Sequence, residues 1–231
     1  MKKILILGII ILSIFLIYLT TIDKKVYFIA IGDEISLGLT KEGYYEKSFP
    51  LYIKEYLEEK NKLEIFIDDY IEQGYRITDL INDINNNKEI EETNKTIKNV
   101  LIKADLVTIT IGTNDILSKI NNEEHLTKID YKRLHKNIQE IVNDLDKLLN
   151  LIREYCKEDI IVVGPNIKTE NENLKKIIDY ANEKFKETSK KYSIEYIKTD
   201  EIIKEKIYPT KDEYKIISEH IIESINSNLL K

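Results

Sequence analysis

The chain has 231 residues, of which 42% are hydrophobic and 33% are charged. This length suits one domain, and the composition supplies a core and differs from that of disordered chains. A single Cys excludes an internal disulfide framework and a cysteine-based zinc site. The formal net charge of −6 argues against a general nucleic-acid binder, so no nucleic-acid partner is expected.

The first predicted element is a membrane anchor at residues 1–22. Residues 4–22 contain no charge, and a helix of about 19 residues spans the roughly 30 Å hydrocarbon core of a bilayer. Two lysines precede this run, as in a signal peptide or a signal anchor. Because no small-x-small cleavage pattern stands before Asp23, we favour an uncleaved anchor. Residues 23–231 then form one domain, expected outside the cell on a single-pass protein of the cell membrane.

Beyond the anchor, apolar strands alternate with amphipathic helices. Short apolar runs predict strands at residues 26–32, 63–67, 106–112, 159–164 and 194–197. Helical spacing of apolar residues predicts helices at 49–60, 78–84, 131–155, 171–192 and 213–230. Apolar strands separated by helices predict a parallel α/β sheet covered on both faces. The polar stretch 85–99 is predicted to be a solvated loop or the start of a helix.

Glycines stand at or just after four of the predicted strands, at Gly32, Gly74, Gly112 and Gly164. Glycine permits the tight turns that lead from a strand into a helix. In parallel sheets, ligand sites also lie beyond the carboxyl ends of the strands. Turn geometry explains the glycines but not the polar residues beside them, and these residues indicate a site at this edge of the sheet.

Those polar residues resemble the sequence blocks of the SGNH/GDSL hydrolases, a family of lipases and esterases. Residues 32–38 read Gly-Asp-Glu-Ile-Ser-Leu-Gly and are similar to the first block, Gly-Asp-Ser-Leu-x-x-Gly. Gly74, with Thr-Asp-Leu at 78–80, resembles the second block, and Gly-Thr-Asn-Asp at 112–115 matches the third. Tyr-Pro-Thr at 208–210 resembles the last block. The four blocks follow in order and cover essentially all of residues 26–231.

This resemblance implies a flavodoxin-like three-layer sandwich with a five-stranded parallel sheet, and ester-bearing lipids or glycans as substrates. It implies an oxyanion hole made by the backbone amides of Glu34 and Gly74 and the side chain of Asn114. With the anchor included, the chain looks most like the small membrane-anchored Gram-positive members of the family.

Every member of the family's catalytic triad is replaced. Glu34 stands at the position of the nucleophilic Ser, Tyr208 at that of the general base His, and Glu205 at that of the orienting Asp. Acyl transfer requires a hydroxyl or thiol nucleophile beside a base. A carboxylate could attack only to form a reactive anhydride, and Tyr, with a pKa of about 10, is a poor base at neutral pH. We therefore expect ordinary serine-esterase chemistry to be lost.

Other nucleophiles and bases offer weaker alternatives. Ser36 opens the helix after the first block and is expected to cap or pack there. His125, in the loop after the third block, is the credible replacement base, although a solvated loop His is the preferred interpretation. His135 and His220 fall within predicted helices. Cys156 precedes the fourth strand, at the wrong edge of the sheet, and is expected to be a packed, inert thiol.

Carboxylates near the site also raise the question of a metal ion. Glu34, Asp115 and Glu205 could converge with Asp33 close by, and three carboxylates would suit Ca²⁺ or Mg²⁺. The family uses Asp33 and Asp115 to brace loops, however, so neither a metal nor another cofactor is predicted.

We interpret Glu34 as a plug, long enough to carry its carboxylate to the Gly74 amide and the Asn114 side-chain amide. The preferred reading is a membrane-anchored pseudoenzyme that binds a ligand or a protein partner at the cell surface, or regulates an active relative. The alternatives are an active ester hydrolase with a reworked site and a scaffold whose cleft is vestigial.

Overall fold

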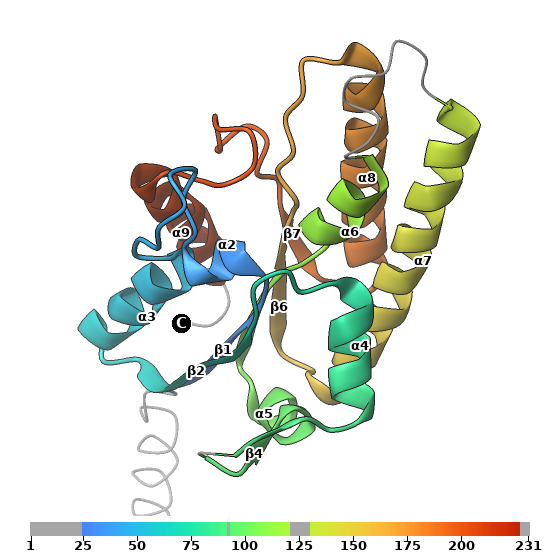
Figure 1. Cartoon of the computed structure of the whole chain (residues 1–231). Coiled ribbons are helices and arrows are strands. Elements are labelled where there is room, and N and C mark those ends of the chain that lie inside the picture. The colour runs from blue at the N-terminus through green and yellow to red at the C-terminus, as the bar shows by residue number, and fades with distance from the viewer. Residues whose placement is uncertain (1–24, 92, 121–129, 227–231) are drawn as a thin grey trace, which may run out of the picture.

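The computed structural model describes residues 25–91, 93–120 and 130–226. Its main sheet has five parallel strands in the order β2-β1-β5-β6-β7 (Figure 1). The strands are β1 (Val26–Gly32), β2 (Leu63–Ile71), β5 (Leu106–Thr110), β6 (Asp159–Val163) and β7 (Glu195–Ile197). The predicted five-stranded parallel sheet is therefore confirmed.

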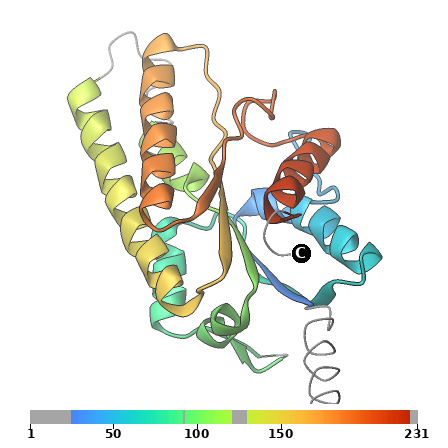
Figure 2. The same cartoon turned by 180° about the vertical axis from the view of Figure 1, so that it is seen from behind.

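Helices cover both faces of this sheet (Figures 1 and 2). One face carries α4 (Ile77–Asn85), α5 (Ile97–Lys103), α6 (Thr113–Ile120), α7 (Tyr131–Tyr155) and α8 (Glu172–Lys191). The other carries α2 (Glu34–Leu37), α3 (Phe49–Glu59) and α9 (Lys211–Asn226).

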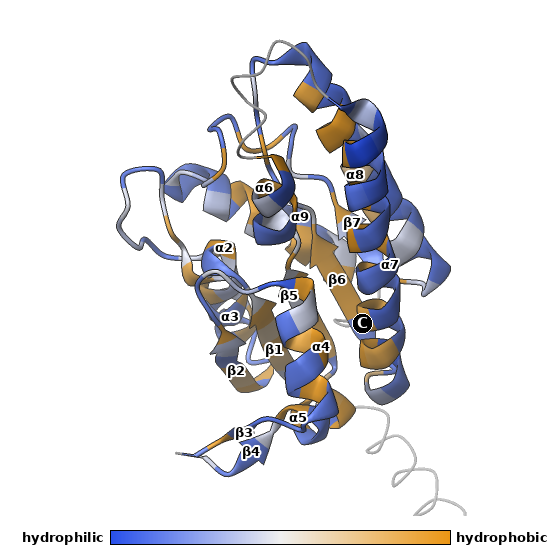
Figure 3. Cartoon of the chain, turned by 45° about the vertical axis from the view of Figure 1, so that its right-hand side comes forward, coloured by the Kyte–Doolittle hydropathy of each residue, from blue (hydrophilic) through white to orange (hydrophobic). Residues whose placement is uncertain are grey.

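Two apolar cores result, one on each face. Successive side chains of a strand point to opposite faces, so Ile29 and Ile31 of β1 enter one core while Phe28 and Ala30 enter the other. Figure 3 shows the apolar strands enclosed by helices whose outer surfaces are hydrophilic. Burial on both faces explains why the central strands read as continuous apolar runs in the sequence.

Several elements depart from the sequence-based prediction. β2 runs to Ile71 rather than ending at residue 67, because it is an edge strand whose Asp68 and Asp69 side chains are exposed to solvent. The stretch 85–99 contains a small antiparallel hairpin, β3 (Glu89–Ile90) with β4 (Lys95–Thr96), which the prediction of a loop or helix start missed. Strands of two residues carry too little alternation to be recognised.

The predicted anchor at residues 4–22 lies outside the described residues, as does the end of the last predicted helix. Among residues 25–91, 93–120 and 130–226, no helix is both long and apolar enough to cross a membrane. The transmembrane helix that we expected ahead of the sheet therefore stays a prediction.

The strand order reverses at β1, because β2 lies on one side of it and β5, which follows in the main sheet, lies on the other. Such a switch point opens a crevice at the carboxyl ends of the strands. Gly32 lets the two central strands approach closely here. It has φ of +144°, and a Cβ at this position would lie 2.2 Å from the Thr110 carbonyl oxygen.

Candidate functional site

Glu34 is held directly above the junction of β1 and β5. It is the first residue of α2, which Asp33 caps by accepting a hydrogen bond from the Ile35 amide at 3.2 Å. The Asp33 amide in turn donates to the Thr110 carbonyl at 3.1 Å. Gly38 ends the helix after a single turn, with φ of 91°. These contacts fix the backbone of Glu34, whose side chain is buried.

The Glu34 carboxylate accepts hydrogen bonds from three separate segments of the chain. Oε2 accepts from the Gly74 amide at 2.8 Å and from Asn114 Nδ2 at 3.2 Å. Oε1 accepts from the Tyr208 hydroxyl at 3.1 Å. The plugged arrangement expected from the sequence is confirmed for Gly74 and Asn114, and Tyr208 adds a third donor.

The donors are braced by the loops that carry them. Asn114 Nδ2 also donates to the Tyr75 carbonyl at 3.2 Å, which ties α6 to the segment after β2. Asp115 accepts from the Ile77 amide at 3.2 Å, at the start of α4. Asp33 and Asp115 thus brace loops, as expected. Gly74 takes a left-handed φ of 76°, a conformation that favours glycine.

Burial raises the pKa of two groups around Glu34. Burial, together with the charge of Glu34, raises the pKa of Asp33 to about 7. Burial, followed by the charge of Glu34 and its hydrogen bond, raises the pKa of Tyr208 to about 12. Tyr208 is therefore protonated at neutral pH, where it donates a proton to the hydrogen bond and cannot serve as a base.

Residues 27–221 match the family model described as GDSL-like lipase/acylhydrolase. The chain belongs to this family. A comparison with curated proteins gave no significant match. Among solved structures, the lipase Lip_vut3 from a goat rumen metagenome is 20% identical, with a TM-score of 0.68 over 85% of this chain and 96% of its own. Axe2, an acetylxylan esterase from Geobacillus stearothermophilus, is 16% identical, with a TM-score of 0.62 over 91% of this chain and 98% of its own. At these identities the likeness shows a shared fold.

Glu205, assigned to the family's Asp position by resemblance, contacts other groups than Tyr208. The Glu205 carboxylate pairs with Lys41 Nζ at 2.6 Å, and its side chain is 30% exposed. The Glu205 carbonyl accepts from Asn166 Nδ2 at 3.0 Å. In the described part of the chain, no hydrogen bond joins the Glu205 carboxylate to Tyr208, so Glu205 does not orient Tyr208 as an Asp would orient a His.

A metal site is not assembled from these carboxylates. Glu34, Asp115 and Glu205 are each engaged by different donors. Within the described residues, no group of three or more His, Cys, Asp or Glu side chains is placed to hold a metal ion.

The alternative nucleophiles are packed. Ser36 Oγ lies 2.7 Å from Thr110 Oγ1 in a buried contact, which agrees with the expected packing role. Cys156 is buried at the end of α7, and burial raises the pKa of its thiol. Asp159, the first residue of β6, stands three positions later, so this thiol lies at the amino edge of the sheet, away from Glu34.

The histidines supply no base beside Glu34 in the part of the chain that is described. His135 lies on α7, with its ring 4.7 Å from that of Tyr180. His220 lies on α9. His125, the credible replacement base of the sequence analysis, falls outside the described residues.

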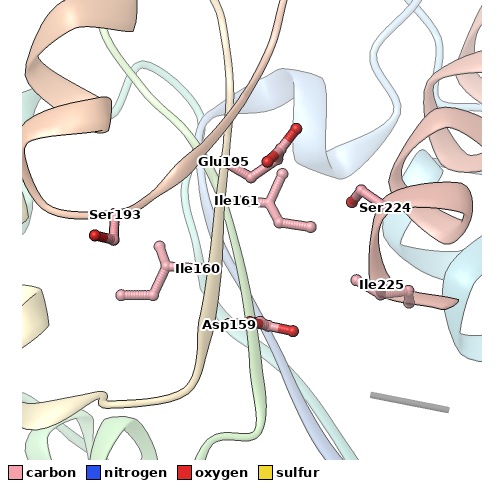
Figure 4. Close-up of a pocket in the computed structure, with 7 residues that line it drawn as sticks. All are labelled: Asp159, Ile160, Ile161, Ser193, Glu195, Ser224 and Ile225. Carbon is pink, nitrogen blue, oxygen red and sulfur yellow. The ribbon is translucent and has the colours of Figure 1, made fainter. Parts of the chain in front are cut away.

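Cavities of the described residues include two at different ends of the sheet. One, of about 350 Å³, adjoins the plug and is lined by Glu72, Gln73, Gly74, Tyr75, Asp79, Asn82 and Asp83. The other, of about 130 Å³, lies where β6 and β7 begin, beside the end of α9 (Figure 4). Its lining residues are Asp159, Ile160, Ile161, Ser193, Glu195, Ser224 and Ile225. Of these two cavities, the first includes Gly74, a donor to Glu34, in its lining.

Sequence reasoning missed Tyr208 as a donor to Glu34. A signal was present: by resemblance, Glu34 and Tyr208 are assigned to partner positions, and a carboxylate and a phenol form a complementary acceptor and donor. The Tyr45 side chain, whose hydroxyl reaches Gln73 Oε1 at 3.4 Å, was also missed. Two consecutive tyrosines after Gly43 in a polar segment were the sign there.

Proposed function

We propose that this GDSL-family protein is a pseudoenzyme that binds a ligand or partner through the cleft beside Glu34. One observation carries the proposal. The Glu34 carboxylate occupies the Gly74 and Asn114 donors that, by resemblance to the family, would stabilise a developing oxyanion.

The chemistry follows from this occupancy. Oxyanion donors accelerate acyl transfer only when they meet the charge that develops in the transition state. Here a permanent anion already satisfies them, and its charge repels a second anion in a buried site. Ser36, the nearest hydroxyl in the first block, is directed to Thr110 instead. The donors therefore stabilise the folded protein rather than a reaction.

The catalytic variants of Axe2 support the contrast. Variants of that esterase in which a Ser, a His or an Asp is replaced by Ala are described as catalytic mutants. By resemblance, the corresponding positions of the present chain hold Glu34, Tyr208 and Glu205. Membership of the family favours a ligand related to its ester-bearing lipids or glycans.

We further propose that residues 4–22 anchor the protein in the cell membrane with the domain outside. The support is the uncharged run itself and the two lysines before it. The partner is then a molecule of the cell surface.

The retained donors favour one alternative, an ester hydrolase with a reworked site. Hydrolysis of p-nitrophenyl acetate by the full-length protein separates the two functions. We expect the parent and Glu34→Gln, which keeps the side-chain shape, to release nitrophenol at the same low rate. Glu34→Ser combined with Tyr208→His is expected to raise that rate at least about tenfold, since a nucleophile and base return beside intact donors.

A parent rate well above that of Glu34→Gln would contradict the pseudoenzyme proposal. It would show that the Glu34 carboxylate takes part in a reaction. Circular dichroism of each variant verifies that the fold is retained.

A further inference from the structure

Two exposed tyrosines stand on an ordered turn that contacts the segment carrying Gly74. Tyr44 and Tyr45 are each 52% exposed. The backbone beneath them is held by hydrogen bonds from the Thr40 amide to the Tyr44 carbonyl and from the Gly43 amide to the Thr40 carbonyl, both at 2.9 Å. Leu39 forms a bridge with Tyr45. The rings are therefore displayed by a preorganised backbone, and they serve no core.

This turn, residues 39–46, links the two segments that close over Glu34. The Tyr45 hydroxyl contacts Gln73, the residue before the donor Gly74. Lys41 pairs with Glu205, in the segment that leads to Tyr208. The turn is also fastened to α9, which it adjoins in Figure 1, because the Tyr214 hydroxyl donates to the Leu39 carbonyl at 2.7 Å.

The charges of the adjoining cavity bear on what can bind there. The charged side chains that line it are carboxylates, from Glu72, Asp79 and Asp83. Lys88 already pairs with Glu72 and Asp83, and the Asp79 carboxylate caps the Arg76 amide. These contacts offset much of the carboxylate charge, so the cavity gives little electrostatic preference to a cationic or an anionic ligand.

The cavity and the turn also carry the kinds of group that bind uncharged sugars. Carboxylates and the amide side chains of Gln73 and Asn82 offer acceptors and donors to hydroxyl groups. The exposed rings of Tyr44 and Tyr45 offer flat apolar faces that also carry a polar end. A cavity of about 350 Å³ lies within the size range of small-ligand sites.

We propose that the turn 39–46 and the cavity beside Gly74 form a binding site for a neutral glycan. A sugar ring packs against Tyr45, and neighbouring hydroxyls bond to Gln73, Asn82 and Asp79. This proposal rests on the proposed ligand-binding function and names its ligand class.

The test is calorimetric titration of the full-length protein in a detergent without a sugar headgroup. The probes are three uncharged oligosaccharides: xylohexaose, cellohexaose and N-acetylchitohexaose. We expect saturable binding of at least one. Tyr45→Ala should weaken that binding about tenfold or more, as loss of an aromatic anchor does, whereas Tyr45→Phe keeps the ring and should lose less than about threefold. Tyr131→Ala removes an exposed tyrosine on α7 and should leave binding unchanged.

Absence of saturable binding for all three sugars at about 10 mM would overturn the glycan proposal, as would equal binding by Tyr45→Ala and the parent. Spermine and polyphosphate serve as charged probes. If either charged probe binds and no sugar does, the glycan proposal is overturned, whereas the proposal of a ligand-binding function is retained. If sugars bind and acetylated xylohexaose is also deacetylated, the glycan proposal is supported and the pseudoenzyme proposal is contradicted. The failures of the two proposals are thus distinguishable.

Discussion

The hydroxyl of Tyr208 donates a hydrogen bond to Oε1 of Glu34 at 3.1 Å, across 174 positions of sequence. By the resemblance described above, these two positions are those of the family's base and nucleophile. Here the raised pKa of Tyr208 holds the proton on the phenol. The pair therefore acts as a fixed structural contact that closes the cleft between α2 and the segment before α9.

Replacing Tyr208 by Phe removes this donor and leaves Oε1 of Glu34 without it. Hydrogen bonds to charged groups contribute about 1.5–3 kcal/mol. We expect the free energy of unfolding to fall by that amount at pH 7, measured by urea unfolding followed through tyrosine emission. Tyr44→Phe, which removes a hydroxyl from an exposed ring, is the matched control. A loss no larger than that of the control would mean that the Tyr208 bond contributes nothing.

Replacing Glu34 by Ala should convert the plugged site into a carboxylate-binding site. The Gly74 amide and Asn114 Nδ2 lose their shared acceptor, and a hydrogen bond to a charged group contributes about 1.5–3 kcal/mol. We expect a lower melting temperature that acetate raises in proportion to the logarithm of its concentration. Chloride at equal ionic strength should not raise it, nor should acetate act on the parent. Equal effects of both salts on the variant would contradict specific binding.

Replacing Asp33 by Asn should change how stability depends on pH. The pKa of Asp33 is about 7 in the folded chain, above its ordinary 3.8. Between these values the folded state holds a proton that the unfolded state releases. The stability from this group is therefore full below about pH 4 and is lost as pH rises through about 7.

The Asn variant lacks this loss and can still accept the Ile35 hydrogen bond. Urea unfolding at intervals from pH 4 to pH 8 should show that the free energy of unfolding of the variant rises relative to that of the parent up to about pH 7. Asp115→Asn provides the comparison. The pKa of Asp115 is about 6, so the relative stability of this variant should stop rising about one pH unit lower. A difference that does not change with pH would show that Asp33 is not protonated in the folded chain.

Replacing Gly112 by Ala should be far more damaging than replacing Gly43. Both have φ in the left-handed region, at +102° and +84°, so both variants carry backbone strain. A Cβ on Gly43 meets open space, whereas one on Gly112 would lie 2.4 Å from the ring of Phe185. We expect Gly112→Ala to cost at least about 2 kcal/mol more in unfolding free energy, through overpacking. Equal losses would indicate that Phe185 moves aside freely.

The sequence by itself determined the sheet and predicted the contacts of Glu34. Buried strands 26–32 and 106–110 were visible because both of their faces are apolar, and helices 49–59 and 131–155 because their apolar residues recur at helical spacing. The identity of Glu34 excluded a hydroxyl nucleophile. Its length predicted that the carboxylate would reach the Gly74 and Asn114 donors.

Only the tertiary structure decided which distant groups meet. Glu205 turns to Lys41 because the turn 39–46 is folded back over the cleft. Tyr208 turns to Glu34 for a similar reason, since α9 packs beside α2 and α3 on one face of the sheet. Local patterns report backbone preference and burial, which depend on neighbours in sequence. Pairing between side chains depends on where loops end in space, and a single chain carries no periodic signal of that.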